Sequence, residues 1–294
     1  MNWAILSILA AFCFAIANII AKYTVGKLVK NPTTPIIFTG FFGLGASIIV
    51  YLFQGYQSSP PFSILLAILA GMLYLSSLII YLQAIKIEEV SIVTALWFLS
   101  PIFVVILSAL FLNETFTIKV YIGILLLVFG AILISTKNLK KIKMGKAFWL
   151  MVLADLLFAI TSLITKYLLN TTNFWTVFSY LRIGAFIAAI PFVLLYFKDL
   201  KHSVHLHGKK VIGLLSIREI ANVTGLILLT AATAIGYVSL VNAISSIQPL
   251  FVLILSIAIS AFYPQALEEN IHSSAIIRKA LAITIMIVGI FLIT

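Results

Sequence analysis

Apolar residues gather in ten long runs along this chain, and short polar segments separate the runs. A membrane-spanning helix needs about 20 apolar residues in succession, because the hydrocarbon core of a bilayer is about 30 Å thick. Transmembrane strands would instead form alternating segments of about 10 residues, whereas these runs are continuous. The pattern therefore predicts an all-α integral membrane protein with ten transmembrane helices, at residues 3–22, 34–53, 62–84, 90–112, 117–135, 147–167, 174–196, 210–233, 238–262 and 275–293.

The pattern repeats at half the length of the chain. The segment Val90–Ser108 returns as Val238–Ser256, with ten identical residues at an offset of 148. Such self-similarity indicates an internal duplication, with one five-helix unit at 1–140 and a second at 145–294. Because five is an odd number, the second unit would cross the membrane in the opposite sense, which gives an inverted repeat.

Composition and charge agree with a membrane protein. The chain is 63% hydrophobic and 9% charged, whereas a soluble domain has roughly 25% charged residues. The net charge of +11 comes mainly from lysines in the short connections between apolar runs, so we expect a lipid bilayer and no nucleic acid as partner. Most of these lysines lie in odd-numbered connections, which the positive-inside rule places in the cytoplasm, with both termini outside. The expected location is the plasma membrane.

The motifs of enzymes and of ATP-driven pumps are missing from the sequence. It contains no GxxxxGK[ST] phosphate-binding loop, no HExxH and no GxSxG. His202, His205 and His207 lie together, but without cysteine or acidic ligands nearby we interpret them as part of an exposed loop rather than a metal site. We therefore expect no enzymatic activity, no cofactor and no metal.

A set of small residues, prolines and one acid follows a recognisable order in the first half. The set comprises Gly71, Tyr81–Ala84, Ser100, Pro101, Asn113, Glu114, Gly123 and Gly130. This order resembles the EamA domain of the drug/metabolite transporter superfamily, and the duplication extends the resemblance over nearly the whole chain. The resemblance implies a ten-helix secondary transporter whose central cavity is lined by the first four helices of each half.

The chain departs from that family pattern at two places. A basic residue is common early in the second span of each half; Arg182 occupies this place in the second half, while the first half has Gly40–Gly43. The glutamate after the fourth span is Glu114, but its counterpart, Glu268 or Glu269, is displaced by an insertion. Relatives are usually drawn with both termini inside, against the charge distribution, so the orientation stays open.

Ionisable residues inside a membrane are costly and are functional candidates. Asp155 and Lys166 share one face of the sixth span, and the repeat places Asn18 and Lys22 on the matching face of the first. The two lysines either act as gates that attract anions or extend from helix ends toward the headgroups. Three further charged candidates are Arg182, Arg218 and Glu219. The acids and arginines either form structural ion pairs, bind the substrate or carry protons as the coupling ion.

The fourth and ninth spans carry matching polar stripes that end at prolines. Trp97 precedes Pro101, and Asn242 precedes Pro249, with Gln248 beside the second proline. A proline lacks the N–H that a helix uses and frees a carbonyl one turn earlier, so it can break the helix where a cavity supplies other partners. The alternative is that both prolines serve packing and Trp97 fills space. The residues that we predict to bind substrate are Asn18, Tyr74, Trp97, Asn222, Asn242 and Gln248.

The function predicted from these features is secondary active transport. The protein would export a small organic metabolite, such as an amino acid, by alternating access around a site at the membrane midplane. Two alternatives belong to other classes: a membrane scaffold or subunit that transports nothing, and an intramembrane enzyme.

Overall fold

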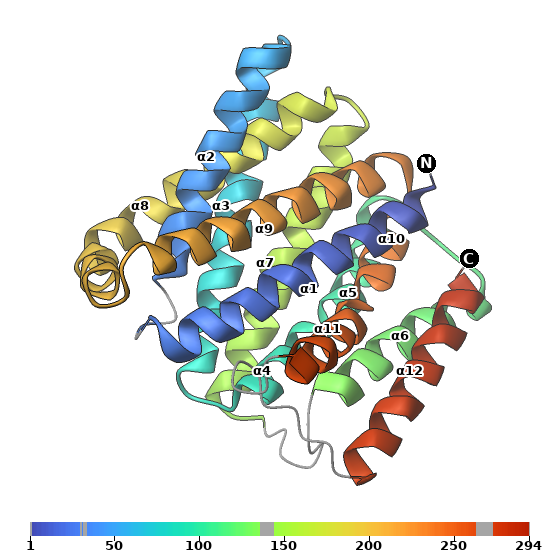
Figure 1. Cartoon of the computed structure of the whole chain (residues 1–294). Helices are drawn as coiled ribbons and strands as arrows, with labels where there is room; N and C mark the ends of the chain where they lie inside the picture. Colours follow the sequence, from blue (N-terminus) through green and yellow to red (C-terminus); the bar gives the residue numbers. More distant parts are fainter. Residues whose placement is uncertain (1, 30, 32–33, 136–143, 263–272, 294) are drawn as a thin grey trace.

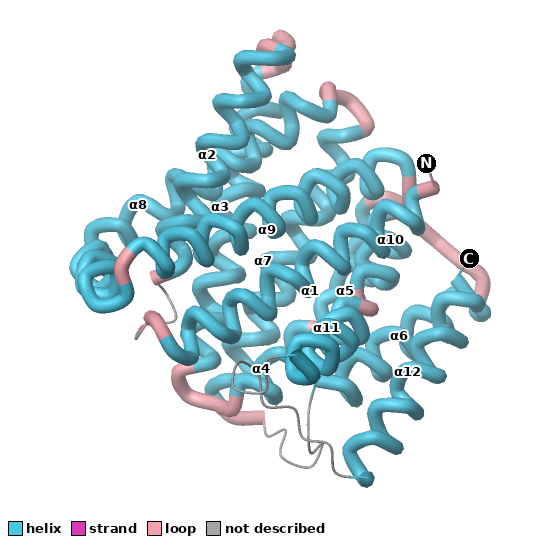
Figure 2. The backbone as a smooth tube through the Cα atoms, viewed as in Figure 1, coloured by secondary structure: helices cyan, strands magenta, loops and turns pink. Residues whose placement is uncertain are grey.

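The computed structural model describes residues 2–29, 31, 34–135, 144–262 and 273–293. Within these ranges the chain is helical and has no strand (Figures 1 and 2). The helices are α1 (Trp3–Lys27), α2 (Pro35–Gln54), α3 (Pro61–Ile85), α4 (Val90–Trp97), α5 (Ser100–Phe111), α6 (Ile118–Ser135), α7 (Lys146–Leu169), α8 (Phe174–His207), α9 (Lys209–Ile235), α10 (Val238–Ser245), α11 (Gln248–Phe262) and α12 (Ser273–Ile293).

Nine segments of the described chain are long and apolar enough to cross a membrane. A shorter apolar helix, Lys279–Ile293 within α12, follows them. The pair α4 and α5 supplies one of the nine segments, Ile92–Phe111, and the pair α10 and α11 supplies another, Val238–Ile259. The all-helical membrane fold predicted from the sequence is thereby confirmed.

The fourth span of each half is broken at the same depth. Helix α4 ends at Trp97 and α5 begins at Ser100, while α10 ends at Ser245 and α11 begins at Gln248. Each second piece carries its proline, Pro101 or Pro249, in its first turn. A proline is tolerated there because the N–H groups of a first turn have no partner within the helix.

The segment 197–209 differs from expectation, because it is helical rather than a loop. Helix α8 continues to His207 and ends at Gly208, whose φ of 63° suits a glycine. Leu200 and Val204 on the extension pack against Val211 and Leu215 of α9. This apolar contact stabilises the extra turns, and the three histidines therefore lie on a helix. Most of the predicted loop 263–274 falls outside the described residues.

Helices of one half pack against helices of the other half in reciprocal pairs. Helix α1 packs along α9 and α3 along α7, while α2 packs with α8 and α6 with α12 (Figure 1). These are the pairings that a two-fold relation between α1–α6 and α7–α12 requires. These pairs, together with α3 and α8, join the halves, so much of the core of the molecule lies between the two units.

The contact between α6 and α12 shows the relative direction of two equivalent helices. A Cβ on Gly123 would lie 2.9 Å from the carbonyl oxygen of Gly289, and a Cβ on Gly130 would lie 3.1 Å from that of Ala282. The start of α6 therefore faces the end of α12, so the two helices run antiparallel. This is the arrangement that an inverted repeat requires.

Candidate functional site

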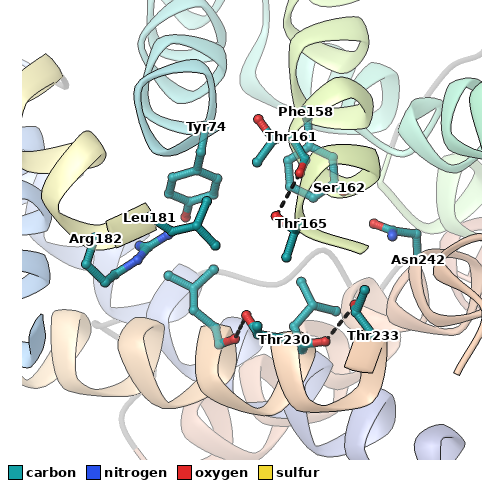
Figure 3. Close-up of a pocket in the computed structure, with 12 residues that line it drawn as sticks. Tyr74, Phe158, Thr161, Ser162, Thr165, Leu181, Arg182, Thr230, Thr233 and Asn242 are labelled. Atoms are coloured by element: carbon teal, nitrogen blue, oxygen red, sulfur yellow. Dashed lines mark hydrogen bonds between the residues drawn. The ribbon is translucent and has the colours of Figure 1, made fainter. Parts of the chain in front are cut away.

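A cavity lies between α7, α8, α9 and α10 of the second half, and Tyr74 of α3 is the lining residue that the first half supplies (Figure 3). The space inside it is about 450 Å³ when its open side is included. Arg182 and Asn242 stand on opposite sides of this space in Figure 3. The lining consists of Tyr74, Phe158, Thr161, Ser162, Thr165, Leu181, Arg182, Leu226, Leu229, Thr230, Thr233 and Asn242.

Close contact between α3 and α8 positions Arg182 at the cavity. A Cβ on Gly71 would overlap the backbone carbonyl of Leu181, and one on Gly184 would overlap that of Ile68, so the two backbones touch. On the other flank, Gly43 of α2 packs beside the arginine stem, and a Cβ there would meet Arg182 Cδ at 3.7 Å, an ordinary van der Waals distance. The first-half segment without a basic residue thus accommodates the arginine of the second half.

The Arg182 guanidinium is buried among aromatic rings. The side chain is only 4% exposed, and its Nε has no hydrogen-bond partner. Its guanidinium carbon lies 5.0 Å from the centre of the Tyr74 ring and 5.7 Å from that of Phe178. A cation over an aromatic face is stabilised by the ring quadrupole, by about 0.5–2 kcal/mol. The rings hold the cation in place without neutralising it.

Glu219 is paired within its own helix rather than across the cavity. Arg218 donates to one oxygen of this carboxylate, Thr39 donates to the same oxygen at 2.9 Å, and Asn222 donates to the other at 3.2 Å. The alternatives that pair Glu219 with Arg182, or Asp155 with either arginine, are therefore not formed in this structure. With Glu219 paired to Arg218, Arg182 lines the cavity without a carboxylate partner.

Asp155 lies in the interior of α7 without a hydrogen-bond partner. The residue is fully buried, and neither carboxyl oxygen has a hydrogen-bond partner. Met151 and Ala154 beside it pack against Leu96 and Ala84 in an apolar cluster. An isolated ionisable group at this depth is costly, so Asp155 needs an explanation other than an ion pair.

The polar stripe of the ninth span contributes a residue to the cavity lining, whereas the stripe of the fourth span does not. Asn242 lines the cavity and donates its amide N–H to the carbonyl of Val238 at 2.9 Å. The Trp97 ring lies 5.5 Å from that of Phe158, which itself lines the cavity. Gln248 is half-buried at the start of α11, and it lies outside the lining together with Pro101 and Pro249.

The two lysines of the repeat are in different situations. Lys166 donates to the carbonyl oxygens of Thr233 at 2.9 Å and Gly236 at 2.8 Å, which ties α7 to the end of α9. Its counterpart Lys22 is exposed, as is Asn18 one turn before it. These two residues continue the face of α1 that carries the fully buried Ala11, so this face becomes open toward the C-terminal end of the helix.

Glu114 closes the same end of the molecule as Lys166. Its carboxylate accepts the backbone N–H groups of Val238 at 3.0 Å and Ser239 at 3.1 Å, and also the hydroxyl of Ser239. A carboxylate at a helix N-terminus satisfies free donors and interacts favourably with the helix dipole. Glu114 of the first half thereby caps α10 of the second half. Glu268 and Glu269 lie outside the described residues.

The sequence-based site list included part of the lining and missed its threonines. Tyr74 and Asn242 line the cavity, and Asn222 lies one turn before Leu226, which also lines it. The missed residues share helix faces with known candidates: Thr230 and Thr233 follow Asn222 by eight and eleven residues. This spacing was the available signal. No group of residues suited to hold a metal occurs in the described parts of the chain.

Comparisons with known proteins identify a family, a sequence relative and a solved structure of similar fold. Residues 1–136 match the EamA-like transporter family. An uncharacterized protein of Methanocaldococcus jannaschii is 32% identical over 136 residues, which are 46% of this chain and 96% of that protein. A crystal structure with 16% sequence identity superposes with a TM-score of 0.72 and covers 99% of this chain and 96% of its own. The archaeal relative thus has about the length of one predicted repeat.

Proposed function

The chain belongs to the EamA-like transporter family of the drug/metabolite transporter superfamily, and we propose that it is a secondary active transporter that exports a small organic metabolite such as an amino acid. One observation carries this proposal. A cavity with polar lining lies inside a membrane protein, among four helices of the second half and against Tyr74 of the first half, and alternating access needs an enclosed polar site of this kind. A membrane scaffold, the first alternative, has no need of such a cavity. An intramembrane enzyme, the second, would need catalytic motifs that the sequence does not contain.

Equivalent lysines make different contacts at the two ends of the molecule, and such asymmetry between repeats supports alternating access. At one end, Lys166 holds the last carbonyls of α9. At the other end, its counterpart Lys22 is exposed. The matching end of α3 has an equivalent backbone hydrogen bond: the Glu88 N–H donates to Ala84 as the Gly236 N–H donates to Ala232. We infer that Lys22 binds the carbonyls at the end of α3 in the opposite state, when Lys166 releases α9.

Protons are the proposed coupling ion, and Asp155 is the proposed carrier. It combines complete burial, the absence of a partner and a position on α7, which also contributes Thr161 and Thr165 to the cavity. The pairing of Glu219 with Arg218 makes that acid a weaker candidate. The proposed location is the plasma membrane, with the predicted substrate residues Tyr74 and Asn242 in contact with the solute.

Exchange of labelled amino acids in proteoliposomes tests the transport proposal. We expect uptake above that of protein-free vesicles when the lumen holds the same unlabelled amino acid. Thr165→Trp would fill the cavity and abolish exchange, whereas Leu194→Trp on the exposed surface of α8 serves as the matched control. Folded wild-type protein that exchanges none of a broad set of metabolites would contradict the proposal and favour the scaffold.

A further inference from the structure

The cavity has two chemically different walls, and we propose that it binds a zwitterionic solute in one orientation, with the carboxylate on Arg182 and the donor group, such as an ammonium, on the threonine hydroxyls opposite. This inference rests on the proposed transport function, since it names the substrate chemistry of the same site. It goes beyond that function by assigning each end of the solute to particular helices.

The α8 wall supplies the only charge. Among the described residues that line the cavity, Arg182 is the one charged side chain. No carboxylate oxygen of the described chain lies within 4.0 Å of it, because Glu219 is held by Arg218. Its Nε is buried and has no partner. Tyr74 and, at longer range, Glu219 stabilise this cation, but no carboxylate contacts it directly, and a buried charge is unfavourable unless it is paired. Arginine matches a carboxylate through paired N–H donors.

The opposite wall offers hydrogen-bond acceptors rather than donors. Thr165 donates its hydroxyl proton to the Thr161 carbonyl at 2.7 Å, Thr230 donates to Leu226 at 2.7 Å, and Thr233 donates to Leu229 at 2.9 Å. A hydroxyl has one proton and two lone pairs. With each proton committed to the helix backbone, these hydroxyls present only lone pairs to the cavity, and such lone pairs accept N–H bonds from an ammonium group.

The charge count favours a carboxylate over a phosphate. A phosphate monoester carries a charge of about −1.5 to −2 near neutral pH, and a second cation would be needed to match it. Lys166 on α7 is already bound to the carbonyls of Thr233 and Gly236, and Arg218 on α9 is paired with Glu219. One arginine and a neutral hydroxyl wall together match a solute with one carboxylate and one donor group.

Thermal stability of the purified protein measures this selectivity, because a ligand that binds the folded state raises the melting temperature. The probes are L-phenylalanine, phenylalaninamide, which lacks the carboxylate, 3-phenylpropionate, which lacks the ammonium, and inorganic phosphate. We expect the amino acid to stabilise most and each truncated analogue to bind about tenfold or more weakly, as loss of a charged hydrogen bond implies. L-threonine with threoninamide forms a second pair for a smaller side chain.

Variants assign the effect to Arg182. Arg182→Gln is expected to abolish the difference between acid and amide, and Arg182→Lys to restore part of it. Lys119→Gln removes the same charge at the start of α6, away from the cavity, and should behave as wild type. Should Arg182→Gln fail to fold, Arg182→Lys and Thr230→Val still report on the two walls separately, since Thr230→Val removes one acceptor and should weaken only ligands that carry the ammonium.

The possible outcomes separate this inference from the transport proposal. Equal stabilisation by acid and amide, stronger stabilisation by phosphate, or no response to either amino acid would overturn the inference. Amide exchange in proteoliposomes at the rate of the acid would do the same while leaving transport intact. Conversely, Arg182-dependent binding of the acid without any exchange across the vesicle membrane would retain the inference and reject transport.

Discussion

Individual charged residues in this membrane protein occupy three different environments. Glu219 is neutralised by Arg218 and two further donors, Arg182 faces the cavity, and Asp155 has no partner. The sequence identified all of these as candidates, because helical spacing reveals which residues share a face. It did not reveal which acid meets which arginine, since that depends on how neighbouring helices pack. Asn18 illustrates the same limit: its face was predictable, but its exposure was not.

Asp155 gives a prediction at this scale. Asp155→Asn keeps the shape of the side chain and removes the proton that it can carry, so we expect a folded protein that still binds its solute but whose flux no longer depends on the proton gradient. Asp199→Asn, an exposed acid on the extension of α8, is the control and should keep wild-type coupling. The measurement is solute flux in proteoliposomes with and without an imposed pH difference. Gradient-driven flux in Asp155→Asn equal to wild type would assign this residue a structural role.

At the scale of helices, the structure depends on contacts between helices that the helical periodicity of the sequence alone does not predict. Gly71 was among the small residues that carry the family resemblance, but only the packing shows that it and Gly184 bring α3 and α8 into backbone contact and so set the place of Arg182. The breaks before Pro101 and Pro249 divide two spans into α4 with α5 and α10 with α11. The sequence supplied the depth of these breaks through the repeat, while the cap that Glu114 forms on α10 required the fold.

Substitution of Gly71 tests the helix contact. A methyl group there would overlap the Leu181 carbonyl, so α3 and α8 must separate. Overpacking of this kind costs about 1–3 kcal/mol, and we expect Gly71→Ala to lower the melting temperature clearly and to weaken binding through Arg182. Gly45→Ala on α2 is the matched control, because a Cβ there meets no atom within 4 Å. Equal melting temperatures for the two variants would show that α3 and α8 accommodate the methyl group.

The two lysines give a second prediction for the helices. Lys166→Met removes both contacts to the end of α9, so that end should open more often, and a cysteine placed at Gly236 should react faster with a soluble thiol reagent in a Cys13→Ser background. Lys22→Met should leave this rate unchanged, because Lys22 is exposed in the present state, and should instead slow flux. Reactivity at position 236 that is the same with and without Lys166 would refute its role as a closing contact.

For the molecule as a whole, the duplication was the most informative feature of the sequence. It predicted two five-helix units, and the structure pairs their helices by exchange, with α6 and α12 antiparallel. The archaeal relative of about half this length agrees in size with one such unit. The helix arrangement does not determine the orientation in the membrane, because an inverted repeat presents similar shapes to both sides. Only the distribution of charge distinguishes the two sides.

Cysteine labelling in intact cells decides that orientation. In a Cys13→Ser background, we expect Lys201→Cys, on the exposed extension of α8, to resist a membrane-impermeant thiol reagent added outside, because the lysine-rich connections are predicted to be cytoplasmic. Ser58→Cys, exposed between α2 and α3, should react, since that connection lies on the opposite side. Both should react once the membrane is permeabilised.

Labelling of position 201 from outside, with protection of position 58, would reverse the predicted orientation and place both termini in the cytoplasm. The closing contact of Lys166 would then lie at the cytoplasmic end, and the open face of Lys22 would face outward. Lys140, in the connection between the halves, lies outside the described residues and would report the same side as Lys201.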